Sequence, residues 1–444
     1  MPGRPVASRI DLLLAVTGVV LAALYWHTPY AGPFERSLGI IGVQLVLFAL
    51  AVVAIVRSSP SRVTLPIVMV FAAVFRLAAL DYTPFLSSDV YRYVWDGRVQ
   101  AAGINPYRYI PADPALAGLR DDVVYVNMNR RDSARTIYPP VAEMLFYAVT
   151  RVHDSVFAMR VAMVGFEALA IAALVTLLGW LSLPRAHILL FAWHPLAVWE
   201  IASSGHLDAI VLAAMGGAFL AHERGRSRLA TALIGAAALV KIYPLALLPA
   251  FWRRWDWKGL ALLTGMILAA YAPYAAGAGW GVLGYLPGYI AEEGFRTGDR
   301  FFLIEFLRRA LDVTLTPEVY MASAGVGLAG LAAWIIARGP RRGRRQVTAV
   351  LLLAASATLV VSPAYPWYFL WLLPCLAVAP SVPLLLVTGA GFVQYVRHVP
   401  GNTVTGYDLN VVQYVGFAIV ALMAGLFRLA HRRRARAVPP GDLA

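Results

Sequence analysis

The chain has 444 residues, of which 60% are hydrophobic and only 14% are charged. This composition excludes an ordinary soluble globular domain and indicates a polytopic membrane protein. Lysine and arginine outnumber aspartate and glutamate by 38 to 24, an excess that in membrane proteins usually reflects basic cytoplasmic loops. No basic stretch is interleaved with aromatic residues in a polar domain, so we expect no nucleic-acid partner.

Apolar runs of about 20 residues, long enough to cross a bilayer, alternate with basic connections along the chain. Basic connections favour the cytoplasmic side, and this rule places both termini there. We therefore predict an all-α polytopic membrane protein with about 12 transmembrane helices. The predicted spans are 11–26, 38–56, 63–80, 156–181, 188–201, 207–221, 260–274, 319–337, 347–361, 367–378, 382–396 and 411–427. A basic cytoplasmic tail, 428–444, follows the last span.

The largest segment on the other side is 81–155, after the third predicted span. It opens with a predicted helix capped by Ser87 or Ser88. Helical spacing places these polar residues on one face: Asp89, Arg92, Tyr93, Asp96 and Gln100. In the first turn the helix dipole favours an ionised Asp89, which suits a general base or a metal ligand. Asp96 could instead form a structural salt bridge with Arg92, four residues before it.

Two short helices of this loop are predicted to lie along the membrane surface and to cover a cavity. In the first, Tyr91, Trp95 and Val99 form an apolar stripe. The second, 142–149, is too short to cross a bilayer. The loop is thus predicted to combine polar, potentially catalytic residues with helices that lie on the membrane surface above the cavity.

Segment 229–251 is apolar but has basic residues at both ends, so a single crossing would leave one basic end on the wrong side. Pro244, just after Lys241, interrupts helical hydrogen bonding. We predict a re-entrant hairpin that holds Lys241 at membrane depth, where a lipid phosphate is its natural partner. The alternative is an ordinary span from which Lys241 reaches the interface.

His206 and Asp208 stand where one predicted span ends outside and the next begins, on the same side as Asp89. They are therefore candidates for the same site, although Asp208 could simply be a first-turn dipole partner. Tyr365 and Trp367 begin another span at that interface. Aromatic residues form a belt there by default, but aromatic faces also bind sugars.

Arg300 and Arg397 are outward cations in the remaining non-cytoplasmic loops. Either could hold a phosphate group through charge-assisted hydrogen bonds. Each could equally be a solvated loop residue. The chemistry of the chain must come from such scattered polar groups, because the sequence has no Cys/His metal spacing and no glycine-rich phosphate loop.

The order of several stretches resembles a known family. Asp89, Tyr91, Tyr93 and Asp96, followed by Asn105-Pro106-Tyr107 and Tyr138-Pro139-Pro140, resemble the first large luminal or periplasmic loop of GT-C glycosyltransferases. The chain looks most like bacterial polyprenyl-phosphate-mannose-dependent mannosyltransferases. It is also similar to the mannosyltransferase of the glycosylphosphatidylinositol pathway, whose loop carries an Asp-x-Asp-Tyr. Here Ser87 replaces the first of those two acids, and the loop follows the third predicted span where GT-C enzymes usually carry it after the first.

The resemblance implies one integral GT-C membrane domain over 1–444 in the bacterial cytoplasmic membrane. It also implies transfer of a sugar, mannose in the first place, from a polyprenyl phosphate to a glycolipid or polysaccharide on the periplasmic side, with inversion. With the residue patterns above, it assigns catalysis to Asp89 and Asp96, and donor phosphate binding to Lys241, Arg300 and Arg397. Substrate binding falls to Tyr93, Tyr138, His206, Asp208, Tyr365 and Trp367.

No cofactor is firmly expected. A divalent cation held by Asp89 with Asp96 and Asp208 stays open as a possibility. The competing function is a polyprenyl-linked lipid flippase or transporter, because broken spans and intramembrane cations also mark such proteins. No internal repeat is visible, and the polar residues gather in one external loop, so transfer is the favoured function.

Overall fold

The computed structural model describes residues 8–437, and within that range all regular structure is helical. The all-α prediction is confirmed. In the same range, seven helical stretches are long and apolar enough to cross a membrane. These are Arg9–Tyr30, Phe34–Arg57, Val156–Trp180, Trp257–Glu292, Pro317–Ala337, Arg344–Val361 and Gly406–Leu429. Shorter apolar helices are Thr64–Leu80, Ser227–Ala238 and Pro366–Val378.

The predicted twelve spans include several that are too short or too broken to meet this criterion. The stretch 188–201 is divided into α8 (Leu189–Ala192), α9 (Pro195–Ala197) and a π-helical turn, Val198–Ser203. Pro195 lacks an N–H, so it begins a new helix and ends the one before it. The stretch 382–396 similarly consists of α19 (Val382–Ala390) followed by a 3₁₀ turn, Gly391–His398.

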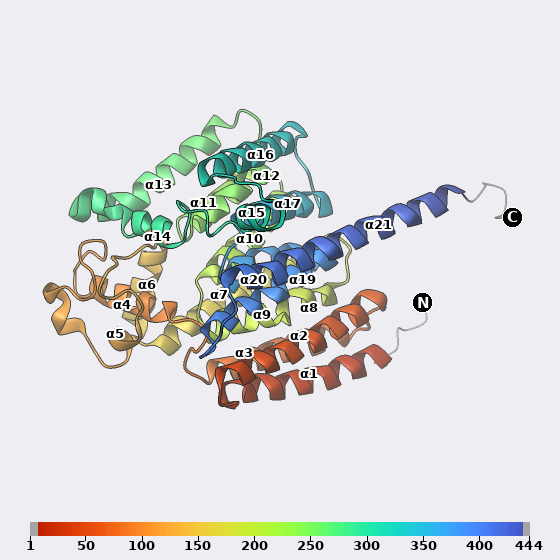
Figure 1. Ribbon diagram of the computed structural model, residues 1–444, viewed down its shortest axis with the longest axis horizontal. Coiled ribbons are helices and arrows are strands. Elements are labelled where there is room, and N and C mark those ends of the chain that lie inside the picture. Colours follow the sequence, from red (N-terminus) through yellow and green to blue (C-terminus); the bar gives the residue numbers. More distant parts are fainter. Residues whose placement is uncertain (1–7, 438–444) are drawn as a thin grey trace.

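The first three helices lie side by side along one flank of the molecule: α1 (Arg9–His27), α2 (Phe34–Arg57) and α3 (Thr64–Leu80) (Figure 1). Polar side chains join them. Thr64 donates a hydrogen bond of 2.5 Å to Asp11, and Gln44 donates one of 3.0 Å to Thr28. Such hydrogen bonds between helices help to hold bundles together where lipid provides no hydrophobic drive.

The centre of the bundle is formed by α7 (Val156–Trp180) and α10 (Asp208–Glu223), which pack against each other. A buried ion pair connects this centre to the first flank, since Arg76 of α3 lies 2.5 Å from Glu167 of α7. The same guanidinium also donates to the carbonyl of Ala192. Because both charges are buried, this pair fixes how the two helices meet.

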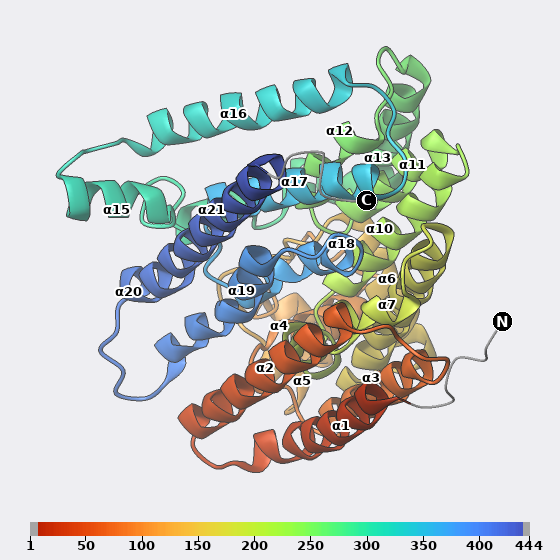
Figure 2. The same ribbon diagram turned by 90° about the vertical axis from the view of Figure 1, so that its right-hand side faces the viewer.

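The loop helices α4 (Asp89–Ala101), α5 (Val124–Asn127) and α6 (Pro140–Val152) gather at one end of the molecule. The start of α1 and the end of α21 (Gly416–Ala437) lie at the opposite end (Figures 1 and 2). The predicted topology likewise separates segment 81–155 from the termini. Which side of a membrane each end faces stays a prediction, and residues 438–444 of the basic tail lie outside the described residues.

Segment 229–251 turns back on itself. Helix α11 (Ser227–Ala238) ends three residues before Lys241, and a 3₁₀ turn, Tyr243–Leu247, and α12 (Leu248–Phe251) return. The backbone N–H of Gly343 donates to Glu223 just before α11, while Gln346 donates to the carbonyl of Ala250. Both ends therefore lie beside the start of one helix, α17 (Arg344–Val361). The depth of the turn in a bilayer stays a prediction.

The remaining helices are α13 (Trp257–Ala278), α14 (Leu286–Glu292), α15 (Phe302–Leu311), α16 (Pro317–Ala337), α18 (Leu373–Val378) and α20 (Gly406–Asn410). Of these, α14 reaches back to the loop helices. The N–H of Tyr285 donates to the carbonyl of Thr136 at 3.1 Å. Gly284 makes this approach possible, because its φ is +59° and a Cβ there would lie 1.8 Å from that carbonyl oxygen.

Candidate active site

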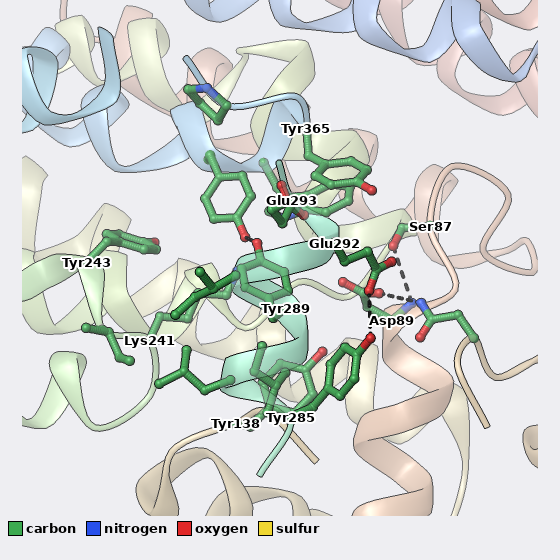
Figure 3. A pocket seen from close by; sticks show the side chains of 18 of the residues that line it. Ser87, Asp89, Tyr138, Lys241, Tyr243, Tyr285, Tyr289, Glu292, Glu293 and Tyr365 are labelled. Atoms are coloured by element: carbon green, nitrogen blue, oxygen red, sulfur yellow. Dashed lines mark hydrogen bonds between the residues drawn. The ribbon is translucent and has the colours of Figure 1, made fainter. Parts of the chain in front are cut away.

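A cavity of about 710 Å³ lies where the loop helices meet the bundle. Its wall is built by the start of α4, the loop 129–139, the turn at Lys241, α14, the end of α17 and residues 363–371 (Figure 3). Segments distant in the sequence thus line one cavity. Figure 3 shows Asp89 and Lys241 on opposite sides of this cavity, with Tyr289 of α14 between them.

Asp89 is the first residue of α4 and faces the cavity. Of the two expected caps, Ser88 occupies the N-cap position without a side-chain cap hydrogen bond, whereas the Ser87 hydroxyl accepts from the backbone N–H of Asp89 at 3.3 Å. The Ser88 hydroxyl accepts from Asn129 instead. The same Asn129 amide donates 2.8 Å to the Asp89 carboxylate. Asp89 is therefore held by a residue of the neighbouring loop.

The Asp89 side chain is only 21% exposed, and it lines the cavity. Burial raises the pKa of this carboxyl above its ordinary value, because the charged form loses hydration. The hydrogen bond from Asn129 and the charges of Lys241 and Arg130 oppose the rise. A carboxylate with raised proton affinity that still faces a substrate-sized space is suited to general-base catalysis.

An aromatic stack lies next to Asp89. The rings of Tyr365 and Trp367 are stacked at 4.5 Å, and the imidazole of His206 stacks on Trp367 at 4.2 Å. His206 Nδ1 is 3.9 Å from Asp89 Oδ2. Tyr365 and Trp367 line the cavity, whereas His206 is fully buried and does not. The structure thus brings together three predicted substrate-binding residues and the predicted base.

Lys241 has a protein partner. Its ammonium group lies 2.5 Å from the carboxylate of Asp208, and the Tyr243 hydroxyl donates to the other oxygen of that carboxylate at 2.6 Å. The lysine also lies 5.5 Å from the centre of the Tyr368 ring. A charge away from bulk water needs a counter-charge, and Asp208 provides it. Asp208 itself is fully buried outside the cavity lining, so it positions Lys241 and Tyr243.

Asp96 and Tyr93 lie behind the cavity wall. The Arg92 guanidinium donates to Asp96 at 2.8 Å, and Asp96 is 1% exposed. The structural salt bridge left open by the sequence is therefore present. Tyr93 is fully buried, stacked on Phe146 at 4.7 Å and edge-on to Tyr138 at 5.0 Å. Of the substrate-binding tyrosines predicted in this loop, Tyr138 lines the cavity and Tyr93 supports it from behind.

The interfacial stripe predicted on α4 is not at the surface. Tyr91, Trp95 and Val99 are 8%, 1% and 2% exposed. The ring of Trp95 packs against Tyr125 of the loop that covers α4. The spacing predicts an apolar face correctly, but the residues of this face are buried in the protein, and the partner of Trp95 is Tyr125 in the connection 112–132.

Of the two predicted outer cations, one lines the cavity and the other does not. Arg300 lines the cavity, lies 4.7 Å from the centre of the Phe295 ring and forms an ion pair with Glu293. Arg397 donates to the backbone carbonyl and side chain of Gln394 and lies outside the cavity lining. Its predicted role in phosphate binding therefore has no geometric support.

Three residues of the loop 129–139 face the cavity but were not singled out from the sequence. Asn129 holds Asp89, and Arg130 pairs with Glu292 of α14 at 2.6 Å. Arg135 lines the cavity too. Within residues 8–437, it is the one lysine or arginine of the lining that has no carboxylate partner. Their irregular loop has no periodicity that would have indicated which side chains point inward.

The arrangement of possible metal ligands bears on the divalent cation left open by the sequence. Among residues 8–437, no group of three or more His, Cys, Asp or Glu side chains is arranged to hold a metal ion. Asp96 is occupied by Arg92, and Asp208 by Lys241 and Tyr243. Both acids thus have protein partners, and the divalent cation stays an untested expectation.

Comparison with known proteins identifies the family to which the chain belongs. The family model described as Alpha-(1->6)-mannopyranosyltransferase, N-terminal domain, matches residues 12–255. No curated protein and no solved structure matches the chain. The matched region is more than half of the sequence and contains Asp89, Asn129, His206, Asp208 and Lys241. The chain therefore belongs to the alpha-(1->6)-mannopyranosyltransferase family, and it is a membrane mannosyltransferase, as its resemblance to polyprenyl-phosphate-mannose-dependent enzymes predicted.

Proposed function

We propose that the protein transfers mannose from polyprenyl-phosphate mannose to a hydroxyl group of a glycolipid or glycan, with inversion, on the periplasmic side of the membrane. One observation carries this proposal: a single cavity has the Asp89 carboxylate on one side and Lys241 on the other (Figure 3). A direct displacement needs a base at the attacking oxygen and a cation at the leaving phosphate, on opposite faces of the sugar.

Asp89 acts as the base. The acceptor hydroxyl attacks the anomeric carbon, a new carbon–oxygen bond forms, and the bond to the phosphate oxygen breaks. The hydroxyl proton moves to the Asp89 carboxylate, and the bonding electrons leave with the polyprenyl phosphate. Asn129 holds the carboxylate at 2.8 Å and so fixes the direction in which it accepts the proton.

Arg135 is the strongest candidate for holding the leaving phosphate. Lys241 and Arg300 are each close to a carboxylate, so part of their positive charge is already neutralised. Arg135 keeps its full charge for a ligand, and its planar guanidinium suits two-point binding of a phosphate. Lys241 adds a second attraction, which is weaker because Asp208 neutralises part of its charge.

The sugar fits the aromatic wall. Tyr365 and Trp367 present a stacked pair of rings to the cavity, and the apolar faces of pyranose rings pack well on such surfaces. Helix α14 adds Leu286, Tyr289 and Ile290 to the lining, and these side chains leave less room for water, which competes with the acceptor hydroxyl. Placement of the site beside a bilayer explains how a polyprenyl chain can stay in lipid while its phosphate reacts.

The test uses the full chain reconstituted in vesicles with radiolabelled polyprenyl-phosphate mannose and a mixed glycolipid acceptor pool. We expect mannose in an acceptor product, release of polyprenyl phosphate in equal amount, and an anomeric configuration opposite to that of the donor. Retention of the donor configuration would contradict a single displacement. Movement of intact donor across the bilayer without any cleavage would instead support the transporter alternative and refute the proposal.

A further inference from the structure

His206 and Glu200 form a buried pair behind Asp89 that the transfer described above does not use. Both side chains are fully buried. Glu200 belongs to the π-helical turn Val198–Ser203, and its Oε2 is 3.3 Å from His206 Nε2. The other imidazole nitrogen, Nδ1, is 3.9 Å from Asp89 Oδ2. The imidazole therefore stands between two carboxylates, one inside the cavity and one beneath it.

The atoms that face one another in this pair are not otherwise engaged. Among the described residues, neither ring nitrogen of His206 makes a hydrogen bond, and Glu200 Oε2 makes none. The other oxygen of Glu200 accepts from the hydroxyl of Tyr395 at 2.9 Å, which fixes the carboxylate. Buried polar atoms without partners are costly, so they indicate a functional demand or a second arrangement of the site.

The ring is also held in place. It stacks on Trp367 at 4.2 Å with an angle of 26° between the planes. Its own backbone N–H donates to the carbonyl of Glu200. These contacts hold the imidazole beside Asp89, with its Nδ1 3.9 Å from Asp89 Oδ2.

Burial favours a neutral imidazole at rest. It faces Asp89 from α4, Glu200 from the π-helical turn and Lys241 from the turn after α11. Burial, with a smaller contribution from the Lys241 charge, holds the pKa of His206 below its usual range. A neutral imidazole has one nitrogen that accepts a proton and one that donates, and a carboxylate at one nitrogen fixes which.

We propose that His206 is a positioning residue that acts through Asp89 as a proton relay, with Glu200 Oε2 placed to accept a hydrogen bond from its Nε2–H. The inference rests on the proposed transfer reaction. When the acceptor hydroxyl gives its proton to Asp89 Oδ2, the proton passes to His206 Nδ1. The imidazolium that forms lies between the Asp89 carboxylate and the carboxyl group of Glu200. After the products leave, the proton returns through Asp89 to solvent, so no other reactant is needed.

Two substitutions separate a relay from simple support. Asn at position 206 places an amide near the former Nδ1, and Gln places one near the former Nε2. A relay requires a titratable ring, so both His206→Asn and His206→Gln should lower kcat by about 100-fold, the lower end of what acid–base groups contribute. KM should change little. His194→Asn is the matched control, because His194 is also fully buried, bonds Thr388 and does not line the cavity.

The pH profile is the decisive readout. A proton shared between Asp89 and an imidazole is held more tightly than by the carboxylate alone, so loss of the ring should move the acid limb of the kcat profile to lower pH. Loss of rate with an unchanged profile would show a merely structural role and overturn the relay. A wild-type rate and profile in His206→Asn would overturn it as well.

A second measurement does not depend on turnover. In a structure of the wild-type protein with polyprenyl phosphate bound, His206 Nδ1 and Asp89 Oδ2 should come within hydrogen-bonding distance. A gap that stays at 3.9 Å or widens would overturn the relay. If the wild type binds polyprenyl phosphate, closes this gap and yet transfers no mannose to any acceptor, the proposed reaction fails while the coupling of the two residues stands.

Discussion

Removal of the positive charge at Lys241 should destabilise the protein through Asp208. That carboxylate is fully buried and would keep only the hydrogen bond from Tyr243. Breaking one side of a buried ion pair typically costs about 3–5 kcal/mol. Because the Tyr243 hydroxyl remains and the Lys241 side chain is 14% exposed, we expect Lys241→Met to cost about 3 kcal/mol, the lower end of that range.

The double variant Lys241→Met/Asp208→Asn removes both charges and should recover most of this loss, because the desolvated charge itself is gone. Both Lys241→Met and the double variant should bind the donor more weakly than wild type, because Lys241 lines the cavity. The assay is the free energy of unfolding in bicelles by reversible denaturant titration, with wild type and both single variants completing the cycle. A Lys241→Met variant as stable as wild type, or a double variant no more stable than that single one, would refute the reasoning.

Three further outcomes follow from the cavity and its cover. Arg135→Gln should weaken binding of polyprenyl phosphate by about 10- to 150-fold, because one charge-assisted hydrogen bond is worth about 1.5–3 kcal/mol, and Arg135→Lys should weaken it less. Calorimetry in detergent measures both affinities. Equal affinity in wild type and both variants would contradict the role of Arg135. Because burial raises the pKa of Asp89 and the base must be ionised, kcat/KM should fall as the pH drops through a midpoint above 3.8, and a midpoint at or below that value would contradict it. Gly284→Ala should lower the melting temperature and the activity, because the new Cβ would clash with the Thr136 carbonyl. Gly279→Ala is also at positive φ but has no atom within 4 Å of the new Cβ, so it should show only the backbone strain. Equal losses in the two variants would show that the approach of Gly284 to Thr136 does not matter.

The parts of the site that could be predicted are those fixed by span ends. Asp89, His206 and Trp367 each follow or begin an apolar stretch on the same predicted side, so their common end of the bundle could be inferred before their distances were known. The structure confirms that they meet, with His206 3.9 Å from Asp89 and stacked on Trp367. The break at Lys241 could also be anticipated, because Pro244 cannot continue a helix.

The partners of these residues could not be predicted. Lys241 was expected to meet a lipid phosphate, and it meets Asp208, because which side chain crosses from one helix to another depends on helix rotation. Asn129 and Arg135 lie in an irregular loop, where neither a period of 2 nor one of 3.6 marks the inward face. Asp96 shows the opposite difficulty: its helical spacing from Arg92 fits both a salt bridge and a catalytic face, and only burial decides between them.

The most direct test of the account is single-turnover mannose transfer by Asp89→Asn beside wild type and Asp132→Asn. Asp132 lies in the same loop, is 75% exposed and does not line the cavity, so its variant controls for the loss of a loop carboxylate. We expect Asp89→Asn to bind polyprenyl-phosphate mannose normally and to release polyprenyl phosphate at least about 100-fold more slowly, while Asp132→Asn reacts like wild type. Release at the wild-type rate by Asp89→Asn would contradict the central claim that Asp89 is the base.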